Sequence, residues 1–100
     1  MDMQPSRELL GRLALKYIWW KTPREAIETP ERVIAQAMNI GSYDDLQELC
    51  TEVGDAYLRG VLSHAEIGQF NERSWSYWHY RLGLTSPGDE IPAMPTRHFG

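Results

Sequence analysis

Hydrophobic side chains recur along most of this chain with the spacing of amphipathic helices, and no segment alternates with the period of two expected for a strand. The first stripe predicts a helix from about Ser6 to Trp20, and its apolar members are Leu10, Leu13, Ala14, Tyr17 and Ile18. The pattern therefore predicts an all-α fold.

Two start signals follow this first helix. Residues 22–25 (TPRE) fit a capping box with proline at the first helical position, which predicts a short helical turn. Thr29 and Pro30 repeat the start signal for a helix over residues 30–40. We expect Gly41 to end that helix in a left-handed conformation.

Two further helices are expected between residues 42 and 65. Ser42 can cap a helix over residues 43–53, and Gly54 is its stop signal. Residues 56–65 keep the helical spacing although Gly60 lies in the middle, where glycine lowers helix stability by roughly 1 kcal/mol relative to alanine. We expect Gly60 to allow a close approach of another helix.

The last helix is expected between Asn71, a good N-cap, and Gly83, a stop signal. Residues 86–95 contain three prolines and cannot continue it. Because helices this short need tertiary packing, we predict one compact cluster of five or six helices over residues 1–84. An extended or flexible Pro-rich tail is expected over residues 85–100.

The composition fits one small domain, since 100 residues with 42% hydrophobic side chains can bury a modest core. A single cysteine, Cys50, can form neither an internal disulfide nor a multi-thiolate zinc site. We therefore expect a cytosolic (cytoplasmic) protein without metal or cofactor. No apolar run approaches the roughly 18 residues of a membrane helix, and the first residues lack the pattern of a secretory signal.

The net charge of -4 is unevenly distributed. Residues 1–24 carry five cations and two acids, whereas residues 25–72 carry ten acids and two arginines. This asymmetry suits either an oriented contact with a partner or an internal match between the two segments. One acidic helix face suits a basic partner, and it consists of Asp44, Asp45, Glu48 and Glu52.

The segment WSYWHYR holds five rings in seven positions. At about 100° per residue, Trp75 and Trp78 share a face that we expect in the core. Tyr77, Tyr80 and Arg81 lie on other faces and are expected to be partly exposed. Exposed tyrosine and arginine side chains are typical of the residues that dominate binding energy at protein interfaces.

Trp19 and Trp20 follow the first stripe and are flanked by Lys16 and Lys21. Lysines at a helix C-terminus are explained by the helix dipole. We therefore expect one tryptophan to close the core and the other to lie at a surface groove.

Candidate catalytic groups are few. His64 and Glu66 have the spacing of zinc deaminases, but the sequence lacks the pair of cysteines that these enzymes need. His79 and His98 have no sequence relation to Cys50 that would indicate a nucleophile pair. Phosphate-binding, dinucleotide-binding and hydrolase motifs do not occur, so we expect a protein that is not an enzyme.

Several motifs between Leu15 and Leu84 follow one another in a distinctive order. They are the pair WW (19–20) and the segments PERVIAQAMNIGSYDD (30–45), LRGVL (58–62) and FNERSWSYW (70–78), with a proline-rich IPAMPTR (91–97) beyond them. This order resembles a family of small bacterial proteins often encoded beside nucleotidyltransferase-type toxins of the AbiEii class. The resemblance implies an antitoxin-like partner protein, and it supplies no catalytic residues.

The sequence thus predicts an antitoxin-like protein that binds and regulates a toxin through protein–protein contacts, using its acidic face and tail against a cationic site. The candidate partner contacts are Trp20, Asp44, Asp45, Glu48, Tyr77, Tyr80, Arg81 and Arg97. One alternative is a nucleic-acid-binding regulator with phosphate contacts at Arg7, Arg12, Lys16, Lys21 and Arg24. Another is a homodimeric module joined through Tyr77, Tyr80 and Leu84.

Overall fold

The computed structural model describes residues 5–95, which form five helices and no strand. The helices are α1 (Arg7–Tyr17), α2 (Pro23–Ala26), α3 (Pro30–Ile40), α4 (Tyr43–Ser63) and α5 (Glu72–Arg81). The prediction of an all-helical protein is therefore confirmed for this part of the chain. Arg97, a candidate partner contact, lies outside the described residues.

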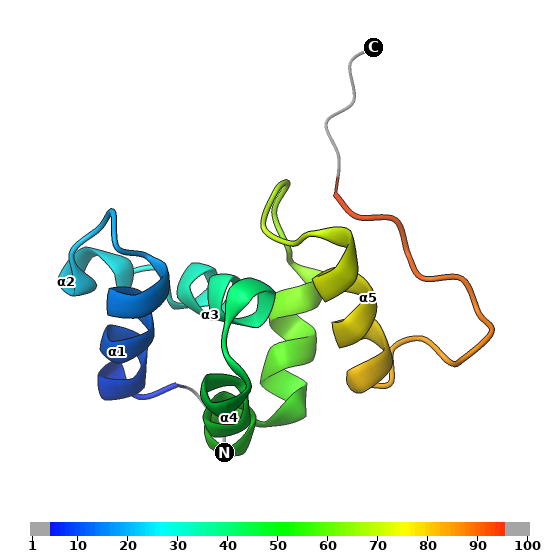
Figure 1. Ribbon diagram of the computed structural model, residues 1–100, viewed down its shortest axis with the longest axis horizontal. Helices are drawn as coiled ribbons and strands as arrows, with labels where there is room; N and C mark the ends of the chain where they lie inside the picture. The colour runs from blue at the N-terminus through cyan, green and yellow to red at the C-terminus, as the bar shows by residue number, and fades with distance from the viewer. Residues whose placement is uncertain (1–4, 96–100) are drawn as a thin grey trace, which may run out of the picture.

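Helix α3 lies at the centre of the molecule. Figure 1 shows α1 and α2 on one side of α3 and α5 on the other, and α3 contacts all four of the other helices. The apolar residues of this helix face its neighbours and are buried, and they are Val33, Ile34, Ala35, Ala37 and Met38. The other helices complete the core with side chains that are essentially inaccessible, among them Leu13, Leu49, Leu58, Leu62 and Trp78.

Local capping determines where most helices begin. The Thr22 hydroxyl and the Glu25 carboxylate form the predicted capping box of α2. The Ser42 and Asn71 side chains accept from backbone N–H groups in the first turns of α4 and α5, as expected. Thr29 differs, because its side chain makes no cap at α3 and instead donates to the Ala26 carbonyl.

Three local expectations were wrong. Helix α1 ends at Tyr17 and does not continue to Trp20. Gly41 is extended, with φ -67° and ψ 153°, and is not left-handed. Its lack of a side chain matters for another reason, since a Cβ atom there would lie 2.3 Å from the Ala37 carbonyl oxygen. A Cβ at Gly60 would meet nothing within 4 Å, so no helix approaches this glycine closely.

Helix α4 is two helical segments joined at Gly54. This residue has φ 76° and ψ 167°, a conformation that glycine adopts at little cost and that interrupts the helical backbone. The predicted stop at Gly54 is therefore confirmed. Figure 1 shows the result, in which the two halves of α4 run in different directions.

Side chains of α5 satisfy the last carbonyl groups of α3. The Trp78 indole N–H donates to the Met38 carbonyl at 2.8 Å, and the Ser74 hydroxyl donates to the Asn39 carbonyl at 2.8 Å. A helix leaves its last carbonyls without partners inside the helix, and burying such groups unpaired is costly. These bonds therefore fix α5 against the end of α3.

Candidate interaction surface

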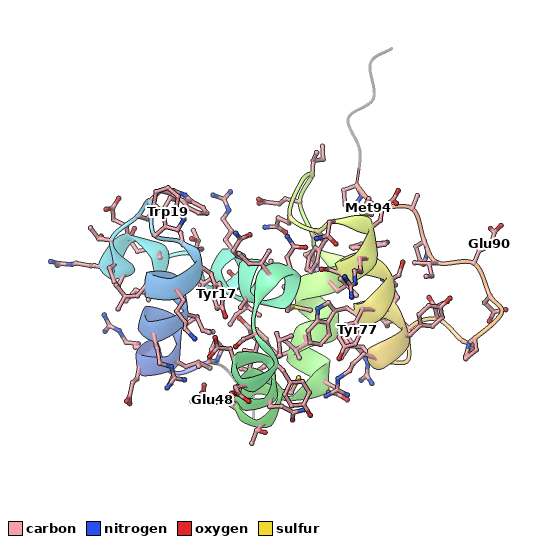
Figure 2. All side chains as sticks on the ribbon, viewed as in Figure 1. Tyr17, Trp19, Glu48, Tyr77, Glu90 and Met94 are labelled. Carbon is pink, nitrogen blue, oxygen red and sulfur yellow. The ribbon has the colours of Figure 1, made fainter. Side chains whose placement is uncertain are left out.

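Helix α5 divides into a buried and an exposed face, as its spacing predicts. Trp75, Trp78 and Leu82 are buried, whereas Tyr77 is 50% exposed and Tyr80 is 45% exposed. Figure 2 shows Tyr77 beside α5, among the side chains that surround the helical core. Its ring lies edge-on to Trp78 with 5.2 Å between ring centroids, so a buried tryptophan supports the exposed tyrosine.

The C-terminal end of α5 is tied to α4 by two arginines. The Arg59 Nε–H of α4 donates to the Leu82 carbonyl at 2.8 Å, which satisfies a carbonyl at the helix end. The Arg81 guanidinium lies 3.7 Å from the Cys50 sulfur. Cys50 and then Tyr77 raise the pKa of Arg81 above its usual value, so this guanidinium is charged at every relevant pH.

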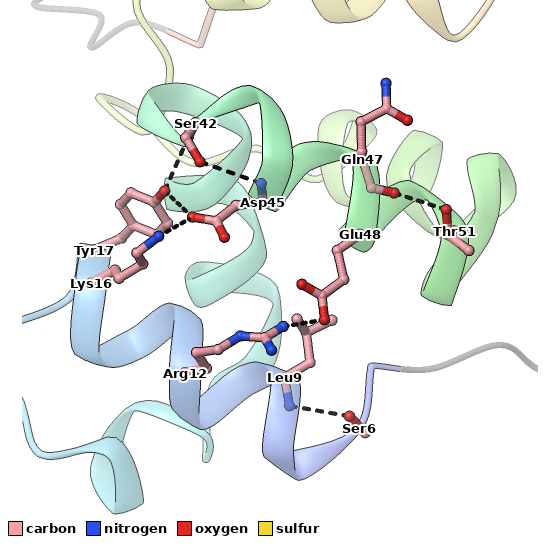
Figure 3. Close-up of polar contacts among 10 residues, drawn as sticks. All are labelled: Ser6, Leu9, Arg12, Lys16, Tyr17, Ser42, Asp45, Gln47, Glu48 and Thr51. Carbon is pink, nitrogen blue, oxygen red and sulfur yellow. Dashed lines mark hydrogen bonds and ion pairs between the residues drawn. The ribbon is translucent and has the colours of Figure 1, made fainter.

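Two acids of the predicted acidic face are bound within the chain. The Asp45 carboxylate accepts from Lys16 Nζ at 2.8 Å and from the Tyr17 hydroxyl, and Glu48 pairs with Arg12 (Figure 3). Asp45 is also buried, whereas Asp44 is exposed. The basic first segment and the acidic middle therefore match each other internally, and Asp45 is not available as a surface contact.

Hydrogen bonding to Lys16, followed by that to Tyr17, lowers the pKa of Asp45 below its usual value. The same contact with Asp45 raises the pKa of Lys16. The Tyr17 hydroxyl also accepts from the backbone N–H of Ser42 at 3.0 Å. No sequence signal pointed to this role of Tyr17, because its partners lie 25 and 28 positions away and are brought close only by the packing of α1 near α4.

Two of the five candidate phosphate contacts form ion pairs within the chain, and three form none within residues 5–95. Arg12 and Lys16 face the carboxylates of α4, whereas Arg7, Lys21 and Arg24 are exposed and form no ion pair among the described residues. The structure therefore offers three of the five cations to an external ligand.

Both tryptophans of the WW pair are exposed, so the expectation that one closes the core was wrong. Trp19 is 78% exposed and Trp20 is 56% exposed, and they meet edge to face with 5.7 Å between ring centroids. Ile18 is the last buried side chain of this segment. Trp20 does line a surface groove of about 360 Å³, as one of the two was expected to do, and Lys21, Arg32 and Ile67 line it as well.

His64 and His79 serve as local hydrogen-bonding groups, and His98 lies outside the described residues. His79 is buried and its Nδ1 lies 2.7 Å from the Trp75 carbonyl one turn earlier. His64 lies beside Ser63, but the nitrogen nearest the Ser63 hydroxyl is Nδ1, which is also 2.9 Å from the Gly60 carbonyl. A proton on Nδ1 satisfies that carbonyl and prevents the same nitrogen from acting as a base toward Ser63.

Part of the predicted tail, residues 91–94, lies against α5, whereas residues 86–90 are exposed. Residues 86–95 contain no helix or strand, and the Trp75 indole N–H donates to the Pro92 carbonyl at 2.7 Å. Ile91 and Met94 are partly buried against the core. This contact covers the buried side of α5 and leaves Tyr77 and Tyr80 exposed.

Within residues 5–95, no three His, Cys, Asp or Glu side chains come together as metal ligands would. None of the helices in this part of the chain combines the length and the apolar character needed to cross a bilayer. No protein-family model matches the chain, and no curated protein or solved structure shows a significant match to it.

Proposed function

We propose that this chain is a non-enzymatic, antitoxin-like protein of the bacterial cytosol that binds and regulates a nucleotidyltransferase-type toxin of the AbiEii class. The identity of the partner rests on the order of motifs between Leu15 and Leu84 and on the gene arrangement that this resemblance implies. The mode of action, direct contact between proteins, rests on the outer surface of α5.

One observation carries this mode of action: Tyr77, Tyr80 and Arg81 are exposed on a helix whose opposite side is fixed in the core. Tyrosine and arginine combine a large contact area with a polar tip, and such residues dominate the energetics of many protein interfaces. A helix held by Trp78 and Ser74 presents them with little loss of conformational entropy on binding.

The internal ion pairs change the expected mechanism. Because Asp45 and Glu48 already pair with Lys16 and Arg12, binding of a cationic toxin site through the acidic face would have to break these contacts. Among the three acids predicted as partner contacts, Asp44 is the one that needs no such rearrangement. We therefore assign the principal contact to α5, with the exposed Trp20 as a second point of contact.

The test is co-expression with the product of the neighbouring gene, which the proposal expects to be a nucleotidyltransferase, followed by affinity purification with and without nuclease. We expect a nuclease-resistant complex that is lost in the double variant Tyr77→Ala and Tyr80→Ala. Tyr43→Ala is the matched control, because Tyr43 is 74% exposed and lies on α4. Failure to recover the neighbouring protein at micromolar concentrations would contradict the proposal.

A second candidate function is binding of single-stranded nucleic acid, and a specific observation favours it. Trp19 and Trp20 are exposed, and Trp20 lines the same groove as Lys21, which forms no ion pair within the described chain. This arrangement combines stacking surfaces with an available cation. Such binding would quench tryptophan fluorescence and weaken steeply with salt. Nuclease-sensitive recovery of the partner would favour this candidate over the first.

A further inference from the structure

The outer arc of α5 carries positive charge only. With about 100° of rotation per residue, Arg73, Tyr80, Tyr77 and Arg81 fall within an arc of about 100°. Glu72, the one acid of α5, points about 100° away from Arg73, on the side where it lines a groove with Pro92 and Met94 of the tail. A partner that contacts the outer arc therefore meets two guanidinium groups and two phenol rings.

Neither arginine of this arc has a carboxylate partner within the described chain. Arg12, Lys16 and Arg32 each pair with a carboxylate, whereas Arg73 and Arg81 form no ion pair among the residues that the structure describes. Asp55 also raises the pKa of Arg81, and its effect is smaller than those of Cys50 and Tyr77. The positive charge of the arc is therefore available to an external group.

The spacing along the helix defines what could bind. Arg73 and Arg81 are eight residues apart, which is about 12 Å along the axis, and Tyr77 lies midway between them. In an extended peptide, residues four positions apart are separated by about 13 Å. Two carboxylates at that separation can meet both arginines while a side chain between them packs on the tyrosines.

Self-association through this face is disfavoured by the same charges. In a twofold contact with antiparallel α5 helices, Arg73 of one copy lies opposite Arg81 of the other. Like charges placed opposite each other in an interface cost binding free energy. The arc therefore fits an acidic partner better than a second copy of this chain.

We propose that the outer arc of α5 binds an acidic segment of a protein partner. Two carboxylates of that segment pair with Arg73 and Arg81, and an apolar side chain between them packs on Tyr77 and Tyr80. This inference rests on the proposed function, and it specifies that the contacting part of the partner is acidic. It reverses the polarity expected from the sequence, which offered the acidic face of this chain to a cationic site.

The first experiment uses synthetic peptides and does not depend on the identity of the partner. A labelled extended peptide with the pattern Glu-x-Leu-x-Glu is compared with its Lys-x-Leu-x-Lys counterpart by fluorescence anisotropy at low salt. Although the chain has a net charge of -4, we expect the acidic peptide to bind about tenfold more tightly. In the double variant Arg73→Glu and Arg81→Glu this preference should invert.

The control variant is Arg7→Glu with Arg24→Glu, which makes the same change in net charge at exposed positions outside α5. It should retain the preference of the wild type for the acidic peptide. Circular dichroism and urea unfolding check that both variants fold. Equal binding of the two peptides, or the same loss of preference in both variants, would overturn the proposal.

The second experiment separates this inference from the proposed function. The same variants are tested for binding to the co-expressed nucleotidyltransferase. If the wild type binds it and the α5 charge reversal does not weaken binding, the acidic-segment inference fails and the proposed function stands. If the wild type does not bind it but the peptide preference inverts as expected, the proposed function fails and the surface assignment stands.

Discussion

Asp45 shows how one side chain can connect distant parts of this chain. Its carboxylate accepts from Lys16 and Tyr17 of α1, while its backbone N–H donates to the Ser42 cap of its own helix. A carboxylate in the first turn is also favoured by the helix dipole. The residue therefore stabilises the start of α4 and its contact with α1 together.

We expect Asp45→Asn to lower the free energy of unfolding by about 1–2 kcal/mol, because two hydrogen bonds to a charged acceptor become weaker bonds to a neutral one. Urea unfolding measures the change. Asp44→Asn is the matched control, since it removes an exposed acid from the same helical turn without touching α1. Equal losses in the two variants would mean that the helix dipole accounts for the whole effect.

The lowered pKa of Asp45 gives stability a defined dependence on pH. A carboxylate whose folded-state pKa lies below its usual 3.8 stabilises the fold fully above that value. This contribution declines as the pH falls below 3.8 and is lost once the pH passes the folded-state pKa. The urea midpoint of the wild type should therefore fall more steeply below about pH 4 than that of Asp45→Asn. Parallel curves would contradict the assignment.

At the scale of single elements, we expect opposite effects from alanine substitutions at Gly41, which follows the end of α3, and at Gly60, which lies within α4. We expect Gly41→Ala to destabilise the protein by about 1–3 kcal/mol, since the new Cβ would lie 2.3 Å from a backbone carbonyl that cannot rotate away. Gly60→Ala should instead stabilise it by about 0.5–1 kcal/mol, because its Cβ meets nothing within 4 Å and alanine favours the helix. Thermal and urea unfolding of the pair measure both effects.

The elements themselves were largely predictable from the sequence because their signals are local. The caps at Thr22, Ser42 and Asn71 and the interruption at Gly54 depend on neighbouring residues, and the structure confirms them. The burial of Trp75 and Trp78 also follows from the rotation per residue. The prediction that one tryptophan of the WW pair closes the core failed because it extended the helical spacing too far. Trp19 and Trp20 lie beyond the end of α1, so their side chains do not continue its buried stripe.

At the scale of the whole molecule, the internal match of charges could not be resolved from the sequence. The uneven distribution was compatible with a partner or with an internal match, and only the packing of α1 near α4 brings Lys16 to Asp45 and Arg12 to Glu48. The same holds for the two arginines of α5. The sequence cannot show that they lack carboxylate partners among the described residues, because the packing of the helices determines which cations form ion pairs. Pairing over about 30 positions leaves no local trace in a sequence.

We expect the isolated chain to be a monomer at micromolar concentrations, because the outer face of α5 would place arginine against arginine in a twofold contact. Light scattering at low and high salt measures the mass. A stable dimer that is disrupted by Tyr77→Ala would favour the homodimeric alternative. A dimer that forms only at high salt would show that the charges are what keeps the copies apart.

The bonds from α5 to the last carbonyls of α3 also have a consequence for how the molecule opens. Trp78 and Ser74 must leave Met38 and Asn39 before the end of α3 can unwind, and α3 contacts each of the other helices. Amide hydrogens in α3 should therefore exchange with solvent deuterium only through global unfolding. The free energy of opening measured by exchange should then fall with urea with the same slope as the free energy of global unfolding. By this measure, the central helix reports the stability of the entire chain.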